Sequence, residues 1–446
     1  MSVTPIQKQV YSSGTIFKMV LPLILSLMIE QVIGFTDVAF LGRVGEIELG
    51  ASALGGVMFL ALVMVGFGYS FSLQAFMGQK NGEKAYRDIG LAFHNGSYFL
   101  LAISLALFVV ALFASRPFLA LVCETPEIAV ATDQYFFWRV AGVPFIYIGA
   151  VYRSFFIATL RPRILTVASV VMALANVVLD YVLIFGFGPV PALGITGAAV
   201  ASSLSEVISV TVYAVYTARF VDTRKYGLFE GLRFDRVIQK KLFVLGRWLM
   251  IQESTAFIVW LYFFVAIEHL GPAALAISNV VRQTSSMFFL LIHSFGSTAG
   301  AICANLIGER RFDEIPGICR RALTITVLCC SPCFAIVILM PEKILGIFTN
   351  LPEIISGGVS TLYVLLGSFV FTIPCMFLNF SMAGMGLTRE TSVATLTAAL
   401  LYVIYIFVVT QYPTTVEVIW SSEYLYNATV GAVCWYYFRQ RRWRTL

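Results

Sequence analysis

The sequence predicts an all-α polytopic membrane protein, with twelve transmembrane helices in two pseudo-symmetric six-helix bundles. The first observation is composition: 59% of the 446 residues are hydrophobic and only 12% are charged. Soluble domains are about 45–50% apolar and about 25% charged. The second is a series of long apolar runs, and the third is an internal repeat. Together they exclude an ordinary soluble domain.

The apolar runs are long enough to cross a bilayer, which takes about 20 residues. Polar loops separate them, so we expect each run to form one helix. In chain order, the twelve expected spans are residues 15–41, 52–78, 91–114, 134–158, 164–187, 194–218, 243–268, 274–304, 319–340, 359–384, 391–411 and 419–438.

Basic residues alternate between successive loops, and this alternation predicts the orientation. The loops after the even-numbered spans and the C-terminal tail hold nearly all of the loop Lys and Arg residues. The opposite side carries only Arg43, Arg116 and Lys343. Because positively charged loops stay in the cytoplasm, we expect a multi-pass protein of the inner (cytoplasmic) membrane with both termini in the cytoplasm.

The longest hydrophilic stretch lies at the middle of the chain, from Arg219 to Lys241, and is basic. It is too polar to span, so we interpret it as a linker between two halves. The expected domains are an N-terminal six-helix bundle at residues 1–218, a cytoplasmic linker at 219–242, and a C-terminal six-helix bundle at 243–446.

The two halves resemble each other at a constant offset of 226 residues. Internal repeats are typical of transporter folds, whose binding sites lie at the repeat interface. With six spans in each repeat, the copies share one orientation and are related by an axis along the membrane normal. The matching segments are Val44–Ser52 with Leu270–Ser278, Gly82–Ile89 with Gly308–Ile315, and Thr166–Ser169 with Ser392–Thr395.

Two acidic residues, Asp37 and Asp180, lie inside apolar spans. A carboxylate in hydrocarbon costs at least roughly 2.5–3.5 kcal/mol, so such residues usually face a cavity on an ion or proton path. Their positions in the second half are not acidic, which confines ion binding mainly to the first half. The offset relates Asp37, Asn176 and Asp180 to Phe263, Tyr402 and Ile406.

Helical spacing brings these polar residues together. Glu30 and Asp37 are two turns apart on one face, and Asn176 and Asp180 are one turn apart. If the first and fifth spans pack, two carboxylates and an amide converge. Burial beside a like charge favours the protonated form of a carboxyl group. The same oxygens can instead replace the water shell of a hard cation such as Na⁺. A helix-helix hydrogen-bond clamp remains the structural alternative.

A hydroxyl group from the start of the sixth span can complete this cluster, and the candidates are Ser202, Ser203 and Thr196. Glu253, early in the seventh span, is either the acid of the second half or a surface partner of Arg247. For the other intramembrane charges, a functional role is no better an explanation than a structural one. The structural explanation is an interhelical ion pair or a side chain that reaches the membrane surface from the end of a span. These charges are Glu206, Arg282 and Glu423.

The sequence lacks the motifs that are typical of several classes of enzyme. The sequence contains no Walker-type phosphate loop, no HExxH and no Gly-x-Ser-x-Gly elbow, and its three histidines are not in a metal-ligand spacing. We therefore expect no enzyme, no cofactor and no metal site beyond possible Na⁺ at the cation site. The net charge of +6 reports orientation, so we expect no nucleic acid as partner.

At two places the residues resemble the multidrug and toxic compound extrusion (MATE) family, in its NorM-like bacterial branch. The likeness covers essentially the whole chain. The first motif is Pro22, Gly34-Phe35-Thr36-Asp37, Gly42-x-x-Gly45, Leu49 and Ala51. The second is Asn176-x-x-x-Asp180-x-x-Leu183-Ile184-Phe185-Gly186, continuing to Gly194-x-x-Gly197-Ala198-Ala199-x-Ala201-Ser202.

The resemblance implies a V-shaped pair of bundles that rocks between outward-open and inward-open states. It implies export of small organic compounds, often cationic, amphipathic or aromatic, in exchange for Na⁺ or H⁺. The family's cation site carries over to Asp37, Asn176, Asp180 and Ser202, where a threonine is common at the last position. The expected partners are these substrates and the lipid bilayer, and the expected state is a monomer.

The second half departs from the family pattern. NorM-type members carry a glutamate in the seventh span at the position of Ala256, and Glu253 lies one turn earlier. The acid of the tenth span has no counterpart. We therefore expect coupling in the first half, with Glu30, Thr196 and Glu253 as possible accessory residues.

Three other functions fit the sequence less well. A flippase for lipid-linked glycans, from a related two-bundle fold, would need a basic cavity for pyrophosphate. Arg139, Arg153 and Arg282 are the obvious candidates within spans, too few to favour it. A membrane-embedded enzyme lacks a nucleophile or metal constellation, and the bundle repeat disfavours a passive channel.

Overall fold

A computed structural model of the chain describes residues 11–123, 125–230 and 233–445. These residues are nearly all helical, with one isolated β-bridge between Phe187 and Val190. The helices are α1 (Ser13–Val44), α2 (Glu46–Gly82), α3 (Tyr86–Val122), α4 (Pro126–Ala141), α5 (Val143–Ala158), α6 (Arg163–Phe185), α7 (Gly194–Phe220), α8 (Thr223–Tyr226), α9 (Arg236–Glu268), α10 (Pro272–Gly308), η1 (Phe312–Glu314), α11 (Ile315–Leu339), α12 (Pro341–Leu345), α13 (Pro352–Gly384), α14 (Thr388–Val409), α15 (Val416–Trp420), α16 (Ser422–Arg439) and η2 (Arg442–Thr445).

The predicted all-α polytopic membrane fold is confirmed. Within the described ranges, ten helices are long and apolar enough to cross a membrane. The expected fourth span, 134–158, is α4 and α5, two helices bent by 42° at Gly142 that count together as an eleventh. Pro144, just after the bend, has no N–H to donate to the preceding turn. The expected twelfth span, 419–438, corresponds to α15 and α16, which are shorter than the ten.

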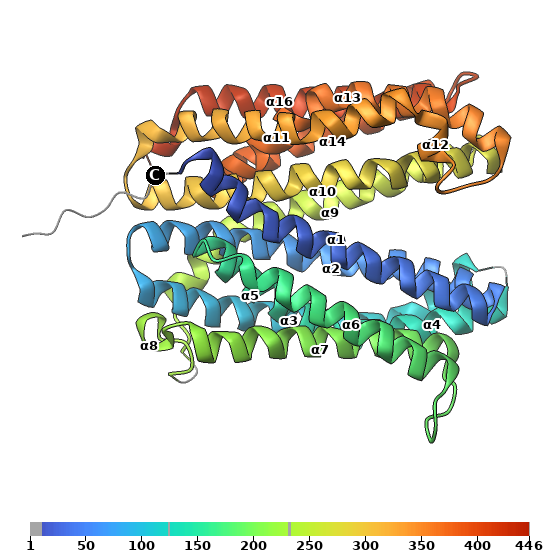
Figure 1. The fold of residues 1–446 in the computed structure, drawn as a ribbon, viewed down its shortest axis with the longest axis horizontal. Coiled ribbons are helices and arrows are strands. Elements are labelled where there is room, and N and C mark those ends of the chain that lie inside the picture. The colour runs from blue at the N-terminus through green and yellow to red at the C-terminus, as the bar shows by residue number, and fades with distance from the viewer. Residues whose placement is uncertain (1–10, 124, 231–232, 446) are drawn as a thin grey trace, which may run out of the picture.

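The helices form two groups that lie side by side (Figure 1). One contains α1 to α8, and the other contains α9 to α16. The first helix of each group contacts equivalent partners: α1 packs against α6 and α10, and α9 packs against α14 and, more extensively, α2. The offset of 226 residues relates α1 to α9, α2 to α10 and α6 to α14, so the sequence repeat appears as equivalent packing.

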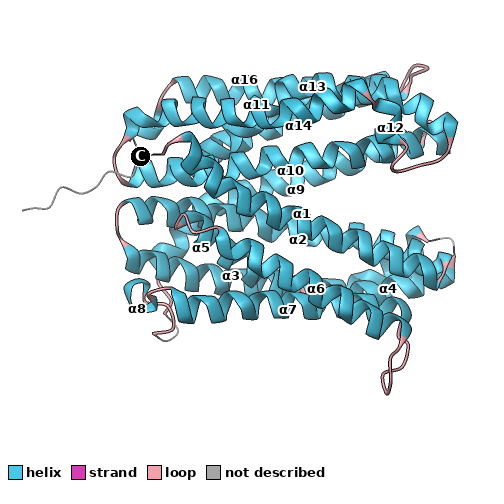
Figure 2. Cartoon of the chain, in the orientation of Figure 1, coloured by secondary structure: helices cyan, strands magenta, loops and turns pink. Residues whose placement is uncertain are grey.

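Short loops join most of the helices (Figure 2). The polar stretch at the middle of the chain contains the one-turn helix α8, and α9 begins at Arg236, before the expected start of the seventh span at residue 243. Asp235 caps α9, because its carboxylate accepts hydrogen bonds from the backbone N–H groups of Val237 and Ile238. Arg87 of α3 forms an ion pair with Glu230 in this stretch.

One close contact between the two groups lies where α2 and α10 end. Asn81 Nδ2 donates to Asn305 Oδ1 (2.6 Å), and Asn305 Nδ2 donates to the carbonyl of Ala158 (2.9 Å). Gly82 and Gly308 occupy equivalent positions in the repeat. A methyl group on Gly82 would collide with the backbone of Asn305, and one on Gly308 with the backbone of Gln79. The absence of side chains therefore permits this contact.

Candidate functional site

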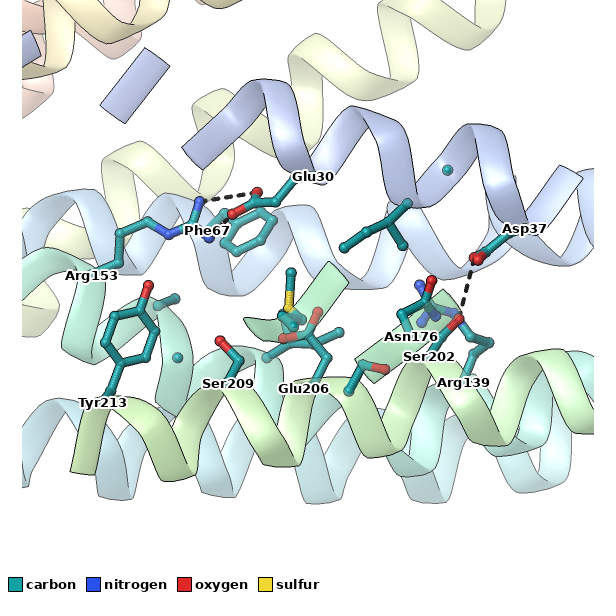
Figure 3. A pocket seen from close by; sticks show the side chains of 17 residues that line it. Glu30, Asp37, Phe67, Arg139, Arg153, Asn176, Ser202, Glu206, Ser209 and Tyr213 are labelled. Atoms are coloured by element: carbon teal, nitrogen blue, oxygen red, sulfur yellow. Dashed lines mark hydrogen bonds and ion pairs between the residues drawn. The ribbon is translucent and has the colours of Figure 1, made fainter. Parts of the chain in front are cut away.

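A cavity of about 280 Å³ lies inside the first group of helices, and we call it the N-half cavity. Helices α1, α2, α4, α5, α6 and α7 surround it, which places it within one half of the repeat. Most of its polar side chains come from helices that face one another across the space (Figure 3). Its polar lining residues are Glu30, Asp37, Arg139, Arg153, Asn176, Ser202, Ser205, Glu206, Ser209 and Tyr213.

At one end of this cavity, three helices bring together the four residues predicted as a cation site. Ser202 Oγ of α7 donates to Asp37 Oδ2 of α1 (3.3 Å). The amide of Asn176 on α6 faces two acids, so its nitrogen is the atom directed at them. In that orientation Nδ2 donates to Asp37 Oδ1 (3.1 Å) and to Asp180 Oδ2 (3.2 Å). The predicted packing of the first and fifth spans is present as α1 against α6.

Asp180 lies behind this end of the cavity. Both Asn176 and Asp180 are fully buried, with 0% of their surface exposed, whereas Asp37 lines the cavity itself. Asp180 Oδ1 has no hydrogen-bond partner among the described residues. A buried acceptor left without a partner costs about 1–3 kcal/mol, and more when it is charged. This Asp180 oxygen can therefore bind one proton or one cation.

Glu30 lies at the other end of the N-half cavity and is already paired. Its carboxylate forms an ion pair with Arg153 Nη2 of α5 (2.6 Å) and accepts a hydrogen bond from Ser169 Oγ (3.1 Å). Glu30 and Asp37 do share one helix face, as their spacing predicts. The structure nevertheless separates them into two polar groups, so Glu30 lies outside the Asp37 cluster.

The remaining candidates lie away from the cluster. Ser203 donates to the carbonyl of Trp138 (2.8 Å), which leaves Ser202 as the hydroxyl that reaches Asp37. Thr196 is in the first turn of α7 and is not among the cavity residues. Glu253 is on α9, in the second half of the chain, and forms no ion pair with Arg247 in the described part of the structure.

Three charged residues of the cavity were not predicted as site residues: Arg153, which pairs with Glu30, and also Glu206 and Arg139. Glu206 lies between the Glu30 and Asp37 groups (Figure 3). Its position was readable, because Ser202, Glu206 and Ser209 are four and three residues apart and share one face of α7. Arg139 of α4 packs its guanidinium over the ring of Phe59, 4.1 Å from the centroid, and its buried Nε has no hydrogen-bond partner in the described ranges.

Repeated helical halves, each with polar residues inside the membrane region, define the architecture of secondary transporters. The chain belongs to the MatE family, whose profile matches residues 22–182 and again residues 251–408. The family resemblance seen in the sequence is thereby confirmed. The two matches fall on the two halves related by the repeat.

Relatives and solved structures agree with this family. The multidrug resistance protein NorM of Aliivibrio fischeri is 24% identical over 350 residues, covering 77% of this chain and 75% of the relative. A probable NorM of Brucella suis is 27% identical over 339 residues, covering 74% and 71%. The fold matches a MOP superfamily transporter from Pyrococcus furiosus with a TM-score of 0.88 at 17% identity, covering 96% and 95%. A eukaryotic MATE transporter, AtDTX14, gives 0.86 at 19%, covering 97% and 96%.

Proposed function

We propose that the protein is an antiporter that exports small organic compounds, often cationic, in exchange for H⁺ or Na⁺. In this proposal Asp37, Asn176, Asp180 and Ser202 bind the coupling cation. One observation carries it: a fully buried carboxylate, Asp180, has an oxygen without a partner among the residues that the structure describes, and it shares an amide with a second carboxylate at the cavity wall. The names of the NorM relatives support multidrug export as the activity.

Electrostatics explains why this cluster would bind a cation. Two carboxylates held by one amide repel each other strongly in a medium of low dielectric constant. A proton on one of them, or a Na⁺ ion between their oxygens, removes that repulsion. Asp37 is the entry point because it lines the cavity, and Asp180 retains the ion because it is buried behind Asn176.

The charge balance of the cavity favours a cationic substrate when the coupling ion has left. In the described part of the chain, Glu30, Asp37 and Glu206 line it together with two basic residues, Arg139 and Arg153. Asp180 adds a further acid at its wall. Ion and substrate would therefore stabilise different states of the same cavity. That difference is what exchange requires, because a ligand shifts a conformational equilibrium only by its differential affinity.

We assign the basic loops to the cytoplasm, in an inner-membrane protein with cytoplasmic termini, acting as a monomer. The close contact of α2 with α10 then lies at the cytoplasmic end and closes it. Transport would alternate between this arrangement and one in which Asn81 and Asn305 separate. The two bundles, residues 1–218 and 243–446, would move as units joined by the linker.

The geometry gives less support to a glycan-lipid flippase. Pyrophosphate binding uses several unpaired basic groups. Arg153 is neutralised by Glu30, and Arg139 shares its cavity with three acids.

The test is ethidium transport in everted membrane vesicles, driven in turn by an imposed pH gradient and an imposed Na⁺ gradient. We expect one gradient to drive uptake by the wild type and Asp37→Asn to abolish the driven component. Asp88→Asn, at a partly exposed position in the first turn of α3 outside the cavity, is the matched control and should transport normally. Normal driven transport by Asp37→Asn would show that the proposed coupling site is wrong. Uphill uptake without either gradient would refute antiport.

A further inference from the structure

The second half of the chain contains a cavity at the position equivalent to the N-half cavity. It measures about 270 Å³ and is formed by α9, α10, α13, α14, α15 and α16; we call it the C-half cavity. Lining residues of the two cavities correspond at the repeat offset of 226. Three such pairs are Asp37 with Phe263, Arg139 with Leu365, and Asn176 with Tyr402.

At these three positions the charged or polar residue of the first cavity is replaced by an apolar or aromatic residue in the second. The C-half cavity takes its charges from other positions, Arg282 on α10 and Glu423 on α16. Both residues lie inside the transmembrane region and line the same space. A charge kept in that environment is costly and usually marks a partner or a ligand path.

Arg282 has no anionic partner among the described residues. Its Nε is buried without a hydrogen bond. Its guanidinium lies against two aromatic rings, with the central carbon 6.0 Å from the centroid of Trp260 and 5.7 Å from that of Phe264. Such stacking holds a guanidinium in place and leaves its N–H groups available for a carboxylate.

Glu423 is held by neutral donors. Tyr402 donates its hydroxyl to Oε1 (3.2 Å), and the amide of Asn427 donates to Oε2 (3.2 Å). These bonds fix the carboxylate at the cavity wall and leave its charge uncompensated, since the described part of the chain provides no ion pair for it. One cation and one anion, each without an ion-pair partner in the described ranges, therefore line the same cavity.

We propose that the C-half cavity binds an aromatic zwitterion, a compound that carries a carboxylate and an amine on an aromatic frame. The carboxylate pairs with Arg282, the amine pairs with Glu423, and the ring packs against Trp260, Phe263 and Phe289. A ligand with both charges compensates both residues, whereas an anion is repelled by Glu423 and a cation by Arg282. This site lies outside the coupling site proposed for the first half.

Three probes with one indole frame and different charged groups test the assignment: tryptophan, tryptamine without the carboxylate, and indole-3-propionate without the amine. Their binding is measured by calorimetry on the full chain in lipid nanodiscs, without any gradient. Each compensated charge is a charge-assisted contact, for which about tenfold in affinity is expected. Tryptophan should therefore bind at least about tenfold more tightly than either analogue.

Two variants assign each charge. Arg282→Met should weaken tryptophan and indole-3-propionate about tenfold and leave tryptamine unchanged or tighter. Glu423→Gln should weaken tryptophan and tryptamine and spare indole-3-propionate. Equal or tighter wild-type binding of a singly charged analogue would overturn the proposal, and so would an equal loss of all three probes in a folded Arg282→Met protein.

The wild-type comparison decides the matter even if a variant fails to fold, and thermal unfolding reports on folding. Because no gradient is applied, a negative result here leaves the antiport proposal standing. A failure of gradient-driven ethidium transport likewise leaves the C-half binding data intact.

Discussion

Replacing Ser202 by alanine removes one hydrogen bond from the cation cluster and little else. The hydroxyl donates to Asp37 Oδ2 at 3.3 Å. Hydrogen bonds to charged groups contribute about 1.5–3 kcal/mol, and the length of this one places it at the lower end. About 1.4 kcal/mol corresponds to a tenfold change in an equilibrium constant, so we expect about a tenfold change in cation binding.

The direction of this change identifies the coupling ion. The Ser202 hydroxyl stabilises the charged carboxylate, so its loss favours protonation. With H⁺ coupling, half-maximal transport by Ser202→Ala should move to higher pH by about one unit. With Na⁺ coupling the same oxygen is a ligand, so its loss should raise the Na⁺ concentration for half-maximal transport about tenfold.

The assay is ethidium uptake by everted vesicles, titrated separately against pH and Na⁺. Ser203→Ala is the matched control on the adjacent residue, because the Ser203 hydroxyl bonds to the carbonyl of Trp138 instead. We expect this control to follow the wild type in both titrations. The reasoning is refuted if Ser202→Ala shifts neither titration, or if the two serine variants shift alike.

Three further predictions concern the gate and the cavity. A short thiol crosslinker between Asn81→Cys and Asn305→Cys should stop transport, and reduction should restore it; transport by a fully crosslinked sample would show that this contact does not open. Gly82→Ala should disfavour the closed α2–α10 contact, because its methyl group meets the backbone of Asn305, so crosslinking yield at that contact should fall several-fold; an unchanged yield would contradict the close approach. Arg153→Met should lower stability by at most about 3–5 kcal/mol, which is the usual cost of leaving one member of a fully buried pair, because this pair is only partly buried. Glu30→Gln added to Arg153→Met should recover most of that loss in thermal unfolding, and a double variant no better than the single one would argue against the pair.

Residue spacing predicted the three carboxylate and amide members of the Asp37 cluster because they lie on two helices, α1 and α6, within one repeat; Ser202 comes from a third helix, α7. Glu30 and Asp37 do share a face of α1, and Asn176 and Asp180 share a face of α6. The remaining question was which helix faces pack against each other. The family motifs indicated that the face of Asp37 meets the face of Asn176 and Asp180. The separation of Glu30 from Asp37 was not predictable, because it depends on Arg153, whose direction is set by the packing of α5.

The bend between α4 and α5 had a signal that the span prediction did not use. Gly142 and Pro144 lie inside the expected span 134–158, and together they interrupt the helix where it bends by 42°. The bend matters for the site, because Arg139 precedes it and Arg153 follows it, and both reach the N-half cavity. Hydropathy alone treats this stretch as one continuous span.

The charges of the second half were also beyond the reach of sequence reasoning. Arg282 and Glu423 were visible as intramembrane charges, but they are 141 residues apart in the chain and their offset counterparts are uncharged. Only the packing of α10 with α13 and of α13 with α16 brings them to one cavity. The repeat predicts where a second cavity lies. The chemistry of that cavity depends on side chains that differ between the two halves.

The central claim is that a cation bound between Asp37 and Asp180 leaves when a substrate binds. The most direct measurement is cation release from purified protein in nanodiscs on addition of ethidium, followed with a pH indicator in weak buffer and with a Na⁺-selective electrode. The account predicts release of about one H⁺ or one Na⁺ per ethidium bound by the wild type, as expected for reciprocal linkage between two ligands. It predicts none from Asp180→Asn. Equal release from Asp180→Asn and the wild type would contradict it.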